Sequence, residues 1–156
     1  MATIEIGIDL GTTNSSVAVI QKSEVQILKN AMGEENTPSI IYVDRNGNIV
    51  VGAKAKRVMN SSNDNLKNCK AEIKRLMGTA ETISFPNLKK ELLPEEISAE
   101  ILKTLRTDIA RKHPEMGLDA AVITVPAYFS TVQSEATKRA GALAGFEQIV
   151  LLQEPI

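Results

Sequence analysis

The sequence has little of the chemistry on which several large classes of protein depend. It contains one cysteine, Cys69, and one histidine, His113. A single cysteine cannot form a disulfide bond within the chain, which favours a reducing, cytoplasmic setting. No group of cysteine and histidine has the spacing of a zinc site, and nothing in the sequence marks triad partners for His113. Metal–thiolate and triad chemistry are therefore not expected.

Charge of one sign and long apolar runs are also missing. The 18 basic and 19 acidic residues give a formal net charge of −1, without a basic stripe, so no nucleic-acid partner is expected. No apolar run is long enough to cross a bilayer, so no membrane is expected either. The start, MATIEIGIDL, has no basic segment and is typical of a strand rather than a signal peptide. With 43% hydrophobic residues, the sequence predicts a globular domain with a core.

Alternating apolar residues predict strands in the first third of the chain. Ile4, Ile6, Ile8 and Leu10 would share one face of a first strand. A turn at residues 11–13 follows, and residues 45–48 resemble a hairpin turn. We expect a β-meander formed by residues 4–10, 16–20, 24–28, 39–43 and 49–51.

Helical patterns dominate the remainder. The strongest helix is predicted for residues 94–112, with a proline in its first turn and cations at its end. A capping box, Ser130 to Gln133, predicts a second helix over residues 131–144. Shorter helices are expected at 53–59 and 66–77, and an irregular segment at 79–93.

The order of these elements predicts the fold class. Antiparallel strands followed by α/β units indicate an α/β protein with a mixed sheet and flanking helices. We expect the sheet to contain residues 4–10, 16–20, 24–28, 120–125 and 148–152.

The turn after the first strand is the first candidate for chemistry. Gly11 would allow an anion to approach the backbone, and the hydroxyls of Thr12 and Thr13 add donors, an arrangement that cradles phosphate. Asp9, at the end of the strand, would face a metal bound to that phosphate. A plain hairpin with a useful glycine remains the alternative.

Three other positions are weaker candidates when taken singly. Lys74, in IKRLMG, could stabilise charge during phosphoryl transfer, or be an ordinary surface lysine. Pro126 ends an apolar strand and fixes the backbone there, or it is simply a proline that terminates a strand. Glu154 follows the last apolar strand, where α/β sheets place ligand residues, or it is an exposed carboxylate.

Eight segments in order resemble the 70-kilodalton heat-shock chaperones. They are IGIDLGTTNSSVAV, NTPSIIYV, VGAKAKR, IKRLMG, PEEISAEILKTL, AVITVPAYF, QSEATKRAGALAGF and LLQEP. The resemblance implies an actin-like, ribonuclease-H-like ATPase fold of two lobes, with ATP or ADP and Mg²⁺ in the cleft between them. Residues 1–156 resemble an incomplete N-terminal lobe, with an inserted, trimmed upper subdomain over about residues 39–112. Because the chain ends in an apolar run and Glu-Pro, we expect it to be the first part of a longer protein.

The resemblance also implies roles for individual residues. The first phosphate loop would consist of Gly11, Thr12, Thr13 and Asn14. Asp9 and Glu154 resemble the carboxylates that hold magnesium through waters. Lys74 resembles the lysine that orients the attacking water and the γ-phosphate. Thr13 and Pro126 correspond to positions that relay the nucleotide state to a peptide-binding domain.

The partners implied are unfolded peptide clients, bound by a downstream domain, with J-domain and nucleotide-exchange cochaperones. Two departures from the family pattern count against standard partners. The stretch between Gly78 and Pro94 is shorter than usual, which puts cochaperone contact there in doubt. Ser134 stands in place of an arginine that helps to couple the two domains. Together with Asn14, which is typical of bacterial relatives, these departures indicate a divergent bacterial type.

Two other functions fit parts of the pattern. A different actin-like ATPase, such as a sugar kinase or a filament protein, would share the turn at Gly11, but the segments around Lys74 and Pro126 argue against it. A nucleotide-sensing module with little turnover is the other alternative. Retention of Asp9, Lys74 and Glu154 argues against that one.

Overall fold

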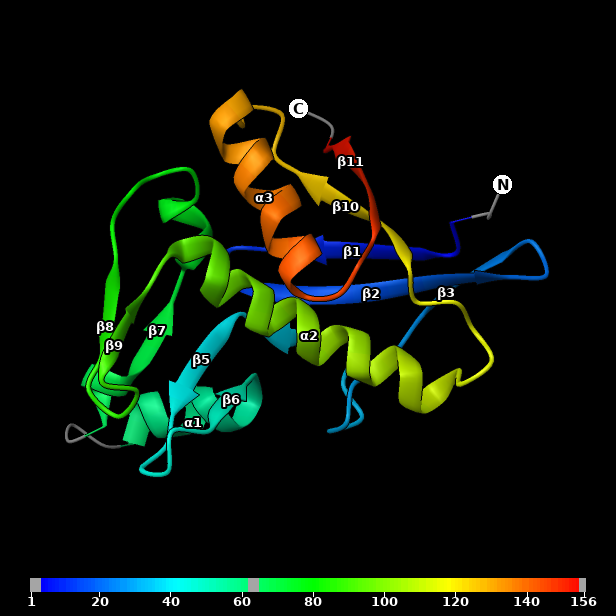
Figure 1. The fold of residues 1–156 in the computed structure, drawn as a ribbon. Coiled ribbons are helices and arrows are strands. Elements are labelled where there is room, and N and C mark those ends of the chain that lie inside the picture. The colour runs from blue at the N-terminus through cyan, green and yellow to red at the C-terminus, as the bar shows by residue number, and fades with distance from the viewer. Residues whose placement is uncertain (1–3, 62–64, 155–156) are drawn as a thin grey trace.

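A six-stranded mixed sheet forms the centre of the molecule (Figure 1). The computed structural model describes residues 4–61 and 65–154. Five strands lie side by side in the order β11-β10-β1-β2-β3, and the short β4 pairs with β2. Their bounds are β1 Ile6–Leu10, β2 Asn14–Gln21, β3 Glu24–Ile27, β4 Thr37–Pro38, β10 Ala120–Val125 and β11 Gln148–Gln153. The predicted mixed sheet of five strands is therefore confirmed.

Strand direction decides which ends of the strands meet. β1 pairs in parallel with β10, and β10 in parallel with β11, whereas β2 is antiparallel to both β1 and β3. The carboxyl ends of β1, β10 and β11 consequently lie at one edge of the sheet. In α/β folds this is the edge where ligands bind.

Two helices cover one face of the sheet. They are α2, Pro94–Lys112, and α3, Thr131–Leu143, and both lie on the same side of the sheet in Figure 1. Ile6, Ile8 and Ile123 face them and are almost fully buried. The alternate residues point to the other face, where Val25 is 71% exposed and Ile27 54% exposed. The two predicted long helices are confirmed, and so is the capping box of α3. In the described ranges, neither these helices nor any other could span a membrane.

A second, smaller layer is formed by the middle of the chain, on the left of Figure 1. It consists of a three-stranded sheet in the order β6-β5-β7, the helix α1 and the hairpin β8-β9. The bounds are β5 Ile40–Val43, β6 Ile49–Val51, α1 Ala53–Ser61, β7 Cys69–Ala71, β8 Ile83–Phe85 and β9 Lys90–Leu92. The extent of a separate upper subdomain stays a prediction.

The predicted meander is wrong beyond β3, because β4 pairs with β2 and not with β3. β5 leaves the central sheet and pairs with β6 and β7 instead. Ile40 and Ile41 follow one another and are both buried, so β5 needs cover on both of its faces. In a meander that is packed on one face only, the other face of β5 would be exposed to solvent.

The helix predicted over residues 66–77 is also wrong. The segment divides into two 3₁₀ turns, η1 Leu66–Asn68 and η2 Ile73–Leu76, on either side of β7. Hydrogen bonding to β5 favours an extended backbone at β7, and Glu72 takes a left-handed φ of 55° that ends any helix. The irregular segment predicted at 79–93 contains instead the hairpin β8-β9. Tertiary pairing overrides local propensity in both places.

Asn68 tests the packing of this layer. Its buried side chain accepts a hydrogen bond of 2.8 Å from the backbone N–H of Asn87, whose own side chain donates to the carbonyl of Val43. We expect Asn68→Ala to lower the free energy of unfolding by about 1–3 kcal/mol, because it leaves that N–H without a partner. Urea denaturation measures the change. Asn60→Ala, at an exposed position, is the control and should have little effect; equal losses in both variants would contradict the assignment.

Candidate functional site

The carboxyl edge of the central sheet carries both of the predicted carboxylates. Asp9 is next to last in β1 and lies opposite Thr124 of β10 in the parallel register. The hydroxyl of Thr124 donates to a carboxylate oxygen of Asp9 over 3.1 Å. Glu154 follows β11, and its N–H donates to the carbonyl of Val125 over 2.8 Å. The two carboxylates therefore start from neighbouring parts of one edge.

The turn from β1 to β2 lies at the same edge. Leu10 pairs with Ser15, so only residues 11–14 make the reversal. A Cβ atom on Gly11 would stand 2.1 Å from the carbonyl oxygen of Asn14, closer than any real contact allows. Within the described ranges, the N–H groups of Thr12 and Thr13 make no hydrogen bond to the backbone outside the strand ladders. Such backbone donors in a tight turn can bind an anion.

Lys74 reaches this edge from the middle layer. It lies in η2 and is buried, and its ammonium nitrogen is 3.9 Å from a carboxylate oxygen of Glu154. The ring of Phe129 lies below the ammonium, with 5.7 Å between the nitrogen and the ring centroid. A cation at that distance from an aromatic face is attracted to it.

Close packing holds η2 in place. Ile73 and Met77, on either side of Lys74, are buried in the core. Gly78, with a φ of +84°, lies against the first turn of α3, where a Cβ atom would meet Gln133 at 3.1 Å. The backbone around Lys74 therefore packs against the core on one side and against α3 on the other.

Burial and charge act on Lys74 in opposite directions. Burial lowers the pKa of Lys74 from its ordinary value, and the nearby carboxylates of Glu154 and Asp9 partly offset this by raising it. A poorly hydrated ammonium group beside two carboxylates interacts strongly with any further charge that arrives.

Pro126 enters the site indirectly. It is buried just after β10, and its carbonyl accepts a hydrogen bond of 3.0 Å from the N–H of Phe129. This turn presents the Phe129 ring to Lys74. Pro126 therefore contacts Lys74 only indirectly, through the side chain of Phe129.

The structure thus brings Asp9, the Gly11 turn, Lys74 and Glu154 to one edge of the sheet. Sequence reasoning missed two contributors, Thr124 and Phe129. Phe129 stands in the quoted segment AVITVPAYF, yet only the tertiary contact indicates its place beneath the ammonium. Thr124 lies in the strand predicted at 120–125, but only the parallel pairing of β10 with β1 places it opposite Asp9.

The oxygen donors at this edge fit magnesium better than a softer metal. Asp9 and Glu154 both lie at this edge, and the described part of the chain has no group of three metal-binding side chains. Mg²⁺ typically keeps several waters and uses one or two carboxylates together with phosphate oxygens. Asp9 and Glu154 are the residues that could hold it.

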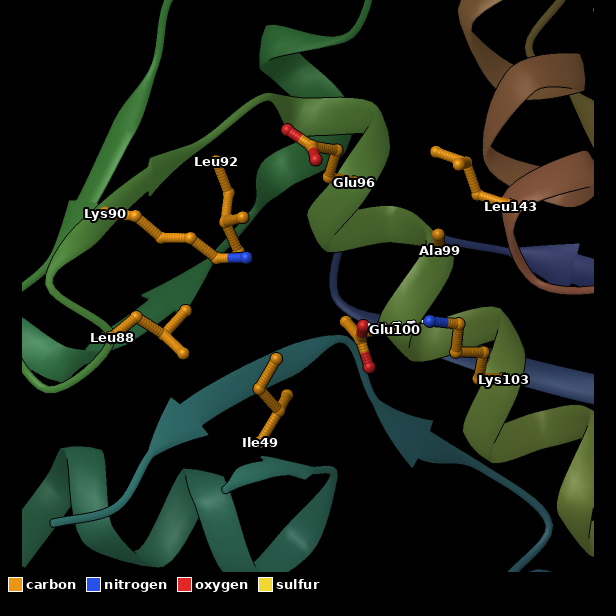
Figure 2. A pocket seen from close by; sticks show the side chains of 9 residues that line it. All are labelled: Ile49, Leu88, Lys90, Leu92, Glu96, Ala99, Glu100, Lys103 and Leu143. Atoms are coloured by element: carbon orange, nitrogen blue, oxygen red, sulfur yellow. Dashed lines mark hydrogen bonds and ion pairs between the residues drawn. The ribbon is translucent and has the colours of Figure 1, made fainter. Parts of the chain in front are cut away.

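The hollow shown in Figure 2 lies away from this edge. It has a volume of about 160 Å³, and its lining comes from the loop and strands of the middle layer, from α2 and from the end of α3. Apolar side chains, such as Leu92 and Leu143, alternate in it with charged ones, including the ion pair of Glu100 and Lys103. None of the candidate residues lines it.

Comparison with known proteins gives a consistent result across nearly the whole chain. A family model described as "Hsp70 protein" matches residues 5–85 and 79–156. The chain is 46% identical over 150 residues to "Chaperone protein DnaK" of Metamycoplasma hominis, and 45% identical over 152 residues to the protein of that name from Mycoplasmopsis synoviae (strain 53). These matches cover 96% and 97% of this chain but 24% of each relative. The chain therefore spans about a quarter of the length of the relatives it matches.

The electrostatic coupling at Lys74 can be measured. We expect Glu154→Gln to lower the pKa of Lys74 further, because the charge that most raises it is removed while the burial remains. Titration of the lysine side-chain resonances by NMR reports this pKa. Glu72→Gln is the matched control, since Glu72 pairs with Arg75 at 3.1 Å instead. A pKa for Lys74 that is unchanged by Glu154→Gln would contradict the coupling.

Proposed function

The chain belongs to the Hsp70 family, and from this premise we propose that it is an ATP-binding lobe of a molecular chaperone ATPase. Such an enzyme couples ATP hydrolysis to the binding and release of unfolded peptides. The observation that carries the proposal is the meeting of Lys74, Asp9, Glu154 and the Gly11 turn, which are far apart in sequence, at one sheet edge. Unrelated surface residues would be scattered instead.

The residues have complementary tasks in this proposal. The N–H groups of the turn bind phosphate oxygens, and the absence of a side chain on Gly11 keeps the turn narrow. Asp9 and Glu154 would hold Mg²⁺, which would supply positive charge beside the phosphates. Thr124 fixes the orientation of the Asp9 carboxylate by its hydrogen bond.

Lys74 acts on the reacting end of the nucleotide. Its ammonium group would lie beside the γ-phosphate and orient the attacking water, where its charge stabilises the transition state. Glu154 and the Phe129 ring hold the ammonium in position before the nucleotide arrives. Such preorganisation lowers the barrier because the group does not have to rearrange during the reaction.

Hydrolysis by this set of residues requires a second wall. Thr13 and Asn14 are exposed, and the side chain of Glu154 is 40% exposed, so the site faces solvent. We propose that the adenosine and the outer phosphates are enclosed by a second lobe in a longer protein. Closure around the nucleotide would expel water and strengthen each charge interaction.

The partners and the setting follow from the same proposal. Unfolded peptides would be bound by another domain of the longer protein, with Thr13 and Pro126 relaying the nucleotide state. J-domain and nucleotide-exchange cochaperones are the expected regulators, although the short segment before α2 and Ser134 depart from the usual pattern. A cytoplasmic setting is favoured by the single cysteine.

Lys74 provides the test of the mechanism in the longer protein. We expect Lys74→Ala to lower the rate of ATP hydrolysis by about 10²–10³-fold while ATP still binds, because the lysine acts mainly in the transition state. A phosphate-release assay and equilibrium binding of ATP measure the two quantities. Arg75→Ala changes the adjacent, exposed cation and should leave both nearly unchanged. Unaltered turnover in Lys74→Ala would remove the lysine from the mechanism.

The 156-residue chain by itself should be a poor ATPase. Because its turn binds the nucleotide from one side only, we expect Mg-ATP to bind weakly, with a Kd on the order of millimolar, and turnover to stay near background. Isothermal titration calorimetry and a phosphate-release assay on the chain measure these. Micromolar binding together with steady hydrolysis would show that one lobe suffices.

A further inference from the structure

The phosphate turn is held from behind by a residue to which no role has been given above. Ser39 lies between β4 and β5 and is 2% exposed. Its hydroxyl donates to the carbonyl oxygen of Gly11 over 2.9 Å, and its backbone N–H donates to the carbonyl oxygen of Thr13, also over 2.9 Å. One residue from a distant part of the sequence therefore binds two of the carbonyls of the turn.

A second buried hydroxyl completes this arrangement. Ser15, which is 1% exposed, lies with its hydroxyl oxygen 2.8 Å from that of Ser39. A serine hydroxyl carries one hydrogen, and the hydrogen of Ser39 points to Gly11. Ser15 must then be the donor in the bond between the two serines. The direction of the chain of hydrogen bonds is Ser15 to Ser39 to the Gly11 carbonyl.

These bonds determine where the donors of the turn point. A trans peptide unit is planar, and its C=O and the following N–H point in opposite directions. The peptide bonds here are trans, since the described residues contain no cis peptide. With the carbonyl of Gly11 directed at Ser39, the N–H group of Thr12, in the same peptide unit, must point away from it. The neighbouring residues Thr13 and Asn14 are exposed, so this part of the turn is accessible to a ligand.

Glycine makes such support necessary. Gly11 lacks a Cβ atom, so the peptide unit that follows it can rotate at lower cost than one after any other residue. Rotation would turn the Gly11 carbonyl outward and present a negative end to an approaching anion. The hydrogen bond from Ser39 opposes that rotation.

We propose that Ser39 is a positioning residue of the phosphate turn, which it holds with its N–H donors directed at the nucleotide. This rests on the proposed function, because the anion concerned is the phosphate chain of that nucleotide. Ser39 does not touch the ligand and acts only through the peptide units of the turn. Ser15 supports Ser39 but has no contact of its own with the Gly11 carbonyl.

Two variants separate the bond from general packing. Ser39→Ala removes the hydroxyl that holds Gly11. Ser39→Cys does the same at nearly constant volume, because a thiol is a weak donor, and it serves if Ser39→Ala does not fold. Ser15→Ala is the matched control, since it removes an equally buried hydroxyl but leaves the bond from Ser39 to Gly11 intact.

The experiment is a titration of the 156-residue chain with Mg-ATP, followed by backbone amide resonances in NMR spectra, with adenosine as the phosphate-free probe. In the wild type, millimolar Mg-ATP should shift the amides of residues 11–14. We expect Ser39→Ala and Ser39→Cys to weaken this binding about 3–10-fold, the effect of one lost hydrogen bond, and Ser15→Ala to change it by less than about twofold. Thermal unfolding should show similar losses of stability for Ser39→Ala and Ser15→Ala, so a purely structural role cannot produce the difference in binding.

The outcomes distinguish the two ideas. Binding by both Ser39 variants as tight as in the wild type, or an equal weakening in Ser15→Ala, would overturn the positioning role and leave the proposed function standing. A wild-type chain whose turn amides do not respond to Mg-ATP would overturn the phosphate site, and the positioning role with it. Weakening confined to the Ser39 variants, with adenosine causing no shift in the turn, supports both.

Discussion

The parallel pairing of β1 with β10 is the constraint on which the rest of the structure depends. It aligns Asp9 with Thr124, residues more than a hundred positions apart, and continues into β11 and Glu154. A parallel ladder needs a long crossover, which here contains the middle layer and α2. α2 and α3 cover one face of the sheet. The candidate residues lie at the carboxyl edge, which these helices leave accessible.

The middle layer brings the cation that this edge lacks. Neither β1, β10 nor β11 places a lysine there, and Lys74 arrives on a 3₁₀ turn instead of a regular helix. Burial disfavours its charge, while Glu154, Asp9 and the ring of Phe129 favour it. An ammonium group held in this balance is poorly solvated yet fixed in direction, which suits a group that has to stabilise charge only when a substrate is present.

The turn at residues 11–14 is also held by a residue from another part of the chain. Ser39 binds the carbonyls of Gly11 and Thr13, which holds two peptide units of the turn in a fixed orientation. Ser39 in turn is placed by the two-residue strand β4, which pairs with β2 immediately beside the turn. The change from the central sheet to the middle layer therefore occurs next to the site. The chain leaves the sheet at the point where it fixes the turn.

The sequence by itself determined the elements whose signal is local. Period-two alternation located the first strand, and apolar runs located the other four. Proline, acidic residues and a capping box located α2 and α3, because these patterns report directly on burial and helix ends. The segment around Gly11 and the family resemblance singled out Asp9, Lys74 and Glu154. Only the tertiary structure decided that residues 69–71 form a strand and that β5 joins a second sheet, because pairing with distant strands outweighs the helical preference of the segment. Likewise, the places of Phe129, Thr124 and Ser39 depend on contacts between segments far apart in sequence, which no local pattern records.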